Sequence, residues 1–320
     1  MRRPLAAAAA LLLVAAVAGV RLGLRTRRDT PVVRIAYAPI LASLPLFVAQ
    51  EQNLFAREKV HVRPLSFSSS NDMVNALIAG QADVLPAVSL VPIVHLEIQY
   101  PGRVRIFSHS RMSHSNALDK VIVQDASGIR ELKDLAGRKI GVFPGTAAPR
   151  MFSSFLRKHG VDPRSVTFVQ LPPAAQLSSL ASGAVDALFS YEPVTTTALV
   201  SGRYRALFGS VYADLLDPCP IGVSAIAREF ERRQPEVAQK TTQVLLEAVS
   251  FAAAHPAEAR ALLPRFARIA PEIAARVNIA DTTLSQQVDV DNIQHFIDLL
   301  YESGEIPERI DARRLIAPTR

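Results

Sequence analysis

A nine-residue phrase occurs twice in this chain, and its repetition limits the folds that the chain can adopt. The first copy reads ALIAGQADV over residues 76–84, and the second reads SLASGAVDA over residues 179–187. A glycine that follows an apolar helical pattern is typical of a helix end, so Gly80 and Gly183 are predicted to end helices. The aspartates, Asp83 and Asp186, are predicted to open the next strands. Both motifs are therefore expected to be scaffold and not ligand contacts.

The residues around each copy predict the same order of strands and helices. In the first copy the pattern predicts strands over 32–37, 61–67 and 83–88, with helices over 45–53 and 72–79. In the second copy it predicts strands over 139–142, 165–171 and 186–190, with helices over 149–159 and 174–182. Ile35 and Gly80 are 45 residues apart, and Ile140 and Gly183 are 43 apart. Two copies of one βαβαβ unit predict an α/β fold of two lobes with parallel sheets.

The segments that flank the second copy suggest how the two lobes are connected. Strand-like stretches over 120–124 and 221–227 are predicted to carry the chain from one lobe to the other and back. Beyond residue 229 the pattern is mainly helical, with predicted helices over 237–254, 257–266, 271–277 and 290–303. Since this part has no strand set of its own, it is expected to return to the first lobe. The predicted division is 31–120 plus 225–320 for lobe 1 and 121–224 for lobe 2.

The first 30 residues differ in character from the rest. Arg2 and Arg3 precede an uncharged apolar run over 5–20, and Ala16-Val17-Ala18 supplies the small residues that a signal peptidase reads. The run is shorter than the roughly 20 residues of a membrane-spanning helix, so a secretory leader cleaved near Ala18 is predicted. Arginines at 21, 25, 27 and 28 oppose translocation of the downstream chain. An uncleaved N-terminal membrane anchor is therefore kept as the alternative.

Composition and motifs exclude several classes of function. The net charge of +7 comes from scattered basic residues and the chain has no Trp, so no nucleic-acid surface is expected. Cys219 is the only cysteine, which rules out disulfides and cysteine metal clusters, and it is expected to be a buried thiol. His109 and His114 have no cysteine or carboxylate nearby other than Asp119, so no metal is expected. No P-loop, nucleophile elbow, zinc-protease or dinucleotide motif occurs, and no cofactor is expected.

Candidate binding residues lie where the predicted strands end. Ligands of α/β sheets bind at the carboxyl ends of strands, and helix N-termini there bind anions through backbone N–H groups. Gly145, Thr146 and Ala147 precede one such helix, and the turn over 68–71 precedes another. Capping of the helices alone is the alternative for Thr146 and for the turn, and at Thr146 capping and ligand contact can hold together.

Three further strand ends supply candidates. Tyr37 and Pro39 come after the first strand, although Tyr37 could equally belong to the core. Ser89 ends the third strand, and Tyr191 with Glu192 ends its counterpart in the second copy. Glu192 would accept a ligand amine or bond across the cleft, or else cap the helix predicted over 195–200.

The second copy also carries a family pattern. DLAGRKIGVFPGTAAPRMFSSFLRKHG (134–160) and LPPAAQLSSLASGAVDALFSYEP (171–193) resemble the substrate-binding proteins of ABC importers of the nitrate, sulfonate and taurine type. This group shares its domain with thiamine-pyrimidine precursor binders and synthases. The shared features are the D-L-x-G-x-x-[IV] strand, the G-T loop, the P-P turn, the L-x-x-G-x-x-D-A strand and the aromatic-Glu-Pro end. The resemblance covers about 31–310 and is weaker over 45–62, where the family has a glycine at Asn53.

The resemblance implies a type II periplasmic-binding fold with two α/β lobes joined by a two-strand hinge. It implies an extracytoplasmic binding protein, not an enzyme, that closes on a small anionic solute such as nitrate, a sulfonate or a taurine-like compound. A monomer is expected. The protein would then dock to an ABC transporter permease. The expected ligand-binding residues are Tyr37, Pro39, Ser43, Ser69, Ser70, Asn71, Ser89, Gly145, Thr146, Ala147, Tyr191 and Glu192.

Two other functions fit the same fold. One is a membrane-tethered solute sensor that passes its signal to a membrane partner. The other is an enzyme like the pyrimidine synthases that use pyridoxal phosphate, which requires a lysine in the cleft for a Schiff base. The lysines are Lys59, Lys120, Lys133, Lys139, Lys158 and Lys240, and none is predicted at the carboxyl end of a strand.

Overall fold

The computed structural model describes residues 31–283 and 288–316. Residues from Val33 onward form one compact unit. The predicted leader and its alternative as an anchor fall in residues 1–30, outside the described residues. Within the described ranges, no helix combines the length and the apolar character needed to cross a membrane.

A six-stranded sheet forms the core of the first lobe, in the order β11-β4-β10-β3-β1-β2. Its strands are β1 (Val32–Tyr37), β2 (His61–Ser66), β3 (Val84–Ser89), β4 (Val104–Met112), β10 (Cys219–Ala227) and β11 (Asp281–Thr283). Strands β1 and β3 are parallel, whereas β10 runs antiparallel to both of its neighbours, β3 and β4. The sheet is therefore mixed, with its repeated βαβαβ part at one side.

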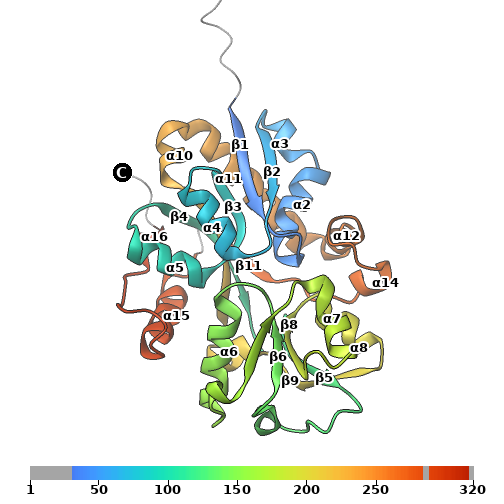
Figure 1. Ribbon diagram of the computed structural model, residues 1–320. Coiled ribbons are helices and arrows are strands. Elements are labelled where there is room, and N and C mark those ends of the chain that lie inside the picture. The colour runs from blue at the N-terminus through green and yellow to red at the C-terminus, as the bar shows by residue number, and fades with distance from the viewer. Residues whose placement is uncertain (1–30, 284–287, 317–320) are drawn as a thin grey trace, which may run out of the picture. The chain divides into compact units, whose positions relative to one another are not determined.

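Helices cover both faces of this sheet (Figure 1). They are α2 (Leu44–Glu51), α3 (Leu54–Arg57), α4 (Ser70–Ile78), α5 (Leu90–Gln99), α10 (Arg228–Arg233), α11 (Pro235–Ala254), α12 (Pro256–Ala261), α13 (Leu263–Phe266), α14 (Pro271–Ala274), α15 (Val290–Glu302) and α16 (Arg313–Ile316). Helix α11 packs on α2, α15 on β10 and α16 on β4. The C-terminal part thus returns to the first lobe as predicted, and β11 adds a strand to that lobe's sheet that the sequence did not predict.

A five-stranded sheet forms the core of the second lobe, in the order β7-β6-β8-β5-β9. Its strands are β5 (Asp119–Gln124), β6 (Lys139–Val142), β7 (Thr167–Gln170), β8 (Ala187–Tyr191) and β9 (Tyr204–Phe208), and its helices are α6 (Ala147–Lys158), α7 (Pro173–Ala181), α8 (Val194–Val200) and α9 (Val211–Leu215). The apolar face of α6 meets the sheet through Phe152, whose ring stacks on Phe189 of β8 at 4.9 Å between centroids. Both rings are fully buried, so this contact anchors α6 to the sheet.

The doubled phrase has the same structural role in both lobes. Gly80 and Gly183 come after the last turns of α4 and α7 with φ of +65° and +75°, a conformation that glycine adopts without strain. Asp83 Oδ2 accepts a hydrogen bond of 2.9 Å from the Arg34 backbone N–H. Asp186 Oδ2 accepts one of 2.9 Å from the Lys139 backbone N–H. Each aspartate therefore ties the start of one strand to the start of its parallel neighbour, as expected of scaffold.

Several predicted elements differ in position. Segments 120–124 and 221–227 are interior strands of the two sheets, and the chain crosses just before each of them, over 113–118 and 216–218. The predicted helix over 257–266 is divided into α12 and α13. Pro264 accounts for the division, because it lacks a backbone N–H and its ring clashes with the carbonyl four residues earlier. Strands β4 and β9 were not predicted.

Candidate functional site

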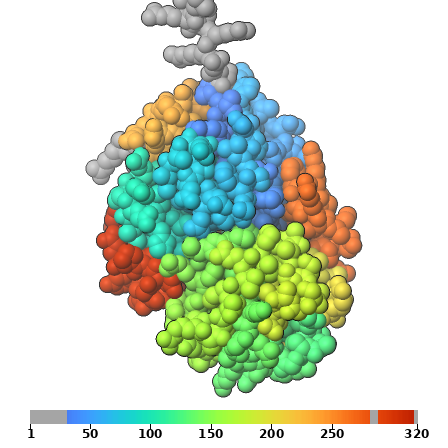
Figure 2. Space-filling view, in the orientation of Figure 1, coloured from blue at the N-terminus to red at the C-terminus, as the bar shows by residue number. Residues whose placement is uncertain are grey.

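A cavity with a volume of about 530 Å³ lies between the two sheets. It is lined by residues at or just after the carboxyl ends of four strands: Ala38 after β1, Ser89 of β3, Phe143 after β6 and Tyr191 of β8. This is the position at which α/β sheets bind ligands. On the face shown in Figure 2, the cyan residues of the first lobe meet the green residues of the second.

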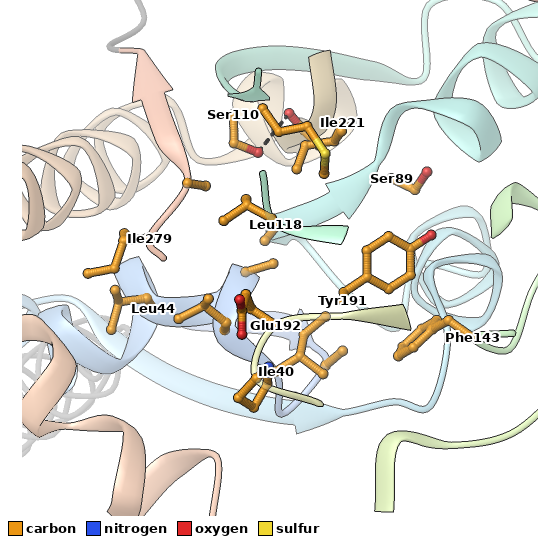
Figure 3. Close-up of a pocket in the computed structure, with 18 of the residues that line it drawn as sticks. Ile40, Leu44, Ser89, Ser110, Leu118, Phe143, Tyr191, Glu192, Ile221 and Ile279 are labelled. Atoms are coloured by element: carbon orange, nitrogen blue, oxygen red, sulfur yellow. Dashed lines mark hydrogen bonds between the residues drawn. The ribbon is translucent and has the colours of Figure 1, made fainter. Parts of the chain in front are cut away.

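The walls of this cleft are mainly apolar. Figure 3 shows Ile40, Leu44, Leu118, Ile221 and Ile279 around the space, contributed by the first lobe, the first crossing of the chain and the C-terminal segment. On one side, the ring of Phe143 meets that of Tyr191 edge to face, with 6.2 Å between centroids. A solute in this cleft would therefore be in contact with hydrocarbon over most of its surface.

The residues of the turn before α4 have two different roles, capping the helix and lining the cleft. Ser69 is buried, and its Oγ accepts a hydrogen bond of 3.1 Å from the Asp72 backbone N–H, so it caps the helix. Ser70 and Asn71 line the cleft. Ser70 Oγ also accepts a hydrogen bond of 3.1 Å from the Ser89 backbone N–H, which joins the turn to the end of β3.

Asn71 reaches across the cleft to the start of α6. Its Oδ1 accepts a hydrogen bond of 3.2 Å from the Thr146 backbone N–H, and the Thr146 Oγ1 lies 3.4 Å from the same oxygen. The Gly145 N–H donates to Gln170 Oε1 at 3.0 Å. Thr146 occupies the N-cap position of α6, as the alternative explanation allowed, but its side chain makes no capping hydrogen bond. Two backbone donors at the start of α6 are thus already bonded to protein groups.

Glu192 has the structural role that the sequence left open. Its carboxylate accepts hydrogen bonds from Thr196, at 3.2 Å from the backbone N–H to Oε2 and 2.9 Å from Oγ1 to Oε1. It therefore caps α8, although it also lines the cleft. Burial raises the pKa of this carboxyl above its ordinary value, against the hydrogen bonds that lower it.

The remaining predicted site residues divide between the cleft and its surroundings. Ala147, Gly145 and Tyr191 line the cleft, whereas Tyr37, Pro39 and Thr146 are absent from its lining. Tyr37 packs edge to face on Phe47 at 6.0 Å between centroids, which is the core position that the sequence allowed.

Ser43 is also absent from the lining. It is fully buried, and its Oγ donates to the Ala38 carbonyl at 2.7 Å. Ser43 therefore shapes the loop behind the cleft wall.

Sequence reasoning missed the contribution of the C-terminal segment. Asn116 Nδ2 donates to the Ile279 carbonyl at 2.9 Å, and Asn278 Nδ2 donates to the Ala117 carbonyl at 3.1 Å. These two bonds tie the segment to the first crossing of the chain. The same segment brings Arg260 into the cleft lining. No local motif marks Arg260, because its place in the site depends on the return of α11 and α12 to the first lobe.

The histidines, the cysteine and the lysines of the described residues lie outside the lining of the cleft. The described part of the chain contains no group of three or more His, Cys, Asp or Glu side chains placed to hold a metal ion. His109 is fully buried, and His114 Nδ1 lies 2.8 Å from Asp217 Oδ2. Cys219 is fully buried as predicted, and burial raises the pKa of its thiol.

Comparison with known protein families decides the classification. The family model described as NMT1/THI5 like matches residues 41–259, more than half of the chain. The chain belongs to the NMT1/THI5 like family.

Relatives of this NMT1/THI5 like protein are binding proteins. It is 22% identical over 285 residues to a "putative aliphatic sulfonates-binding protein" of Bacillus subtilis (strain 168), which covers 86% of this chain and 83% of that protein. It is 25% identical over 226 residues to the "taurine-binding periplasmic protein" of Escherichia coli (strain K12), covering 70% of this chain and 68% of that protein.

A solved structure supports the fold of the NMT1/THI5 like protein. The crystal structure of the periplasmic aliphatic sulphonate binding protein SsuA from Escherichia coli superposes with a TM-score of 0.70 at 20% identity, covering 89% of this chain and 97% of that one. The periplasmic-binding fold predicted from the sequence is confirmed. The named relatives are binding proteins and not enzymes, in agreement with the predicted class.

Proposed function

We propose that this chain is the solute-binding component of an ABC importer, which captures a small anionic solute in the cleft and delivers it to a membrane permease. The observation that carries the proposal is an apolar cleft of about 530 Å³ at the carboxyl ends of strands from both lobes. The relatives support it, since they are named as binding proteins for aliphatic sulfonates and for taurine.

Contacts on either side of the cleft support a mechanism of closure. Asn71 of the first lobe bonds to Thr146 of the second, and Arg150 of α6 forms an ion pair of 2.6 Å with Glu305, which lies just after α15. A solute that touches both lobes would favour the closed form over an open one, because only the closed form makes both sets of contacts. The closed form would then be the state that a permease recognises.

We propose lobe 1 as residues 31–120 plus 225–320 and lobe 2 as 121–224, as the sequence indicates. The pairing of β10 with β4 from Cys219 onward supports moving the second boundary to about residue 218. The chain would work as a monomer outside the cytoplasm. Mass spectrometry of the N-terminus of the mature protein tests this location: cleavage near Ala18 supports export of a released protein, and a retained leader supports a membrane-tethered sensor.

Thermal unfolding with added solutes tests the binding function. A solute at a hundredfold excess over its Kd stabilises the folded protein by about 2.7 kcal/mol. Alkanesulfonates, taurine, nitrate and pyrimidines form the panel. Failure of every compound to raise Tm would contradict the proposal.

A matched pair of variants distinguishes the cleft from the rest of the surface. Ala253 lines the cleft, whereas its neighbour Ala254 in α11 does not, and both are exposed. Ala253→Trp is expected to abolish the stabilisation by solute, because the indole fills space that the solute needs. Ala254→Trp is expected to keep it.

A further inference from the structure

The charged side chains that line the cleft restrict the charge of the solute that can bind there. Among the described residues that line it, the only charged side chains are Arg260 and Glu192. The Glu192 carboxylate is bonded to Thr196 and burial raises its pKa, so it is a poor partner for a solute cation. Arg260 is therefore the main source of charge that a solute meets.

Arg260 is positioned to bind an anion. Its Nε donates to the Val277 carbonyl at 2.9 Å, which fixes the guanidinium beside the cleft. Within the described ranges, no carboxylate forms an ion pair with it, in contrast to Arg265, which pairs with Glu51 at 2.6 Å. The terminal nitrogens of Arg260 also make no hydrogen bond to another described residue. A guanidinium binds sulfonate or carboxylate oxygens through two parallel hydrogen bonds.

The other expected anion site is already bonded within the protein. The sequence favoured backbone N–H groups at the start of α6, but the Gly145 N–H is bonded to Gln170 and the Thr146 N–H to Asn71. An anion placed there would have to displace these acceptors, whereas an anion at Arg260 displaces none. The geometry therefore favours Arg260 as the group that selects charge.

The apolar walls select the rest of the molecule. A volume of about 530 Å³ lined mainly by aliphatic and aromatic side chains is much larger than an inorganic oxyanion needs. A zwitterion with an ammonium group would lose the hydration of that group without gaining a free carboxylate. Hydrocarbon, in contrast, gains from leaving water, and each buried methylene strengthens binding about fourfold.

We propose that the solute is a monoanion with an apolar organic body, whose anionic group is bound by Arg260 and whose body is held by the apolar walls. This inference rests on the proposed solute-binding function and adds a substrate class and a specificity-determining residue to it.

A homologous series of linear alkanesulfonates, from ethanesulfonate to octanesulfonate, tests the role of the walls by calorimetric titration of the full chain. Affinity is expected to rise about fourfold per methylene until the cleft is filled. Taurine and nitrate are expected to bind more weakly than octanesulfonate. Tighter binding of taurine or nitrate, or no dependence on chain length, would overturn the inference and leave the importer function intact. Failure of every compound to bind would overturn both.

Variants of Arg260 test its role in selecting charge. Arg260→Gln is expected to weaken octanesulfonate binding about 10- to 100-fold, the loss expected for a hydrogen bond to a charged group. Binding of the uncharged analogue 1-octanol is expected to change less than threefold. Arg260→Lys keeps the charge but loses the two parallel donors, so it is expected to recover only part of the affinity.

Arg276 supplies the matched control, since it is exposed, belongs to the same C-terminal segment and does not line the cleft. Arg276→Gln removes the same net charge and is expected to leave the affinity within twofold. Unfolding scans without ligand confirm that each variant is folded. Equal loss in Arg260→Gln and Arg276→Gln, or equal loss for the sulfonate and the alcohol, would show that Arg260 does not select charge.

Discussion

Replacing Gly145 by alanine perturbs the point at which the two lobes meet. Gly145 has φ of +113°, which L-residues rarely adopt, and an added Cβ would lie 2.9 Å from Asn71 Oδ1. The backbone strain costs about 1–3 kcal/mol. The Asn71 side chain must also move and give up its bond to the Thr146 N–H, which costs about 0.5–1.5 kcal/mol more. Gly145→Ala is therefore expected to lower the free energy of unfolding by about 2–4 kcal/mol.

Urea unfolding of four proteins separates the two contributions: wild type, Gly145→Ala, Asn71→Ala and the double variant. Without the Asn71 side chain, the alanine costs only the backbone strain, so its effect should shrink by about 1 kcal/mol. Gly128→Ala is the control, because its added Cβ meets no atom within 4 Å. An equal cost of Gly145→Ala in both backgrounds would refute the idea that Asn71 couples the lobes here.

Three other predictions test the scaffold. Asp119 is fully buried and burial raises its pKa to about 6 from the ordinary 3.8, so the folded state binds the proton more tightly and stability rises as the pH falls. From pH 7 to pH 5, the free energy of unfolding of wild type should rise by about 1.3 kcal/mol relative to that of Asp119→Asn, as measured by urea titration. An unchanged difference between the two proteins would contradict the buried position of Asp119. Asp83→Ala should lower the free energy of unfolding by about 2–4 kcal/mol and Asp186→Ala by about 1 kcal/mol. The reason is burial, because the Asp83 side chain is 5% exposed and that of Asp186 is 33% exposed. Equal shifts of the two urea midpoints would be inconsistent with this. Asn53 has φ of +54°, so Asn53→Gly should leave Tm unchanged or raise it, whereas Asn53→Ala should cost about 1 kcal/mol.

The repeated frame could be predicted from the sequence because its signals are local. Strand β6 begins and ends at the predicted residues, and Gly80 and Gly183 end helices as expected. Strand β4 was missed because its sequence VRIFSHSRM mixes polar and apolar residues without strict alternation. Its Ser108 and His109 are buried by β10 and other elements from distant parts of the chain, which no local pattern reveals.

The candidate site was harder to predict than the frame for the same reason. Ser69 and Ser70 are adjacent in sequence, yet one caps α4 and the other lines the cleft. That difference depends on side-chain direction at a helix start, which residue type alone does not determine. Arg260 lines the cleft only because the C-terminal helices fold back to the first lobe. No local sequence pattern distinguishes this arginine from the others.

Asp83 and Asp186, which each tie two parallel strands together, lie at the opposite ends of their strands from the cleft. From Asp83 to Ser89 is six residues of extended chain, or roughly 20 Å at about 3.3 Å per residue. Substitutions that far apart with no shared partners add independently. Substitutions of the residues that line the cleft should therefore have little effect on the residues that stabilise the sheets. The cleft can therefore be redesigned for another compound without weakening the aspartate hydrogen bonds between the strands. This makes the protein a practical starting point for sensors of new solutes.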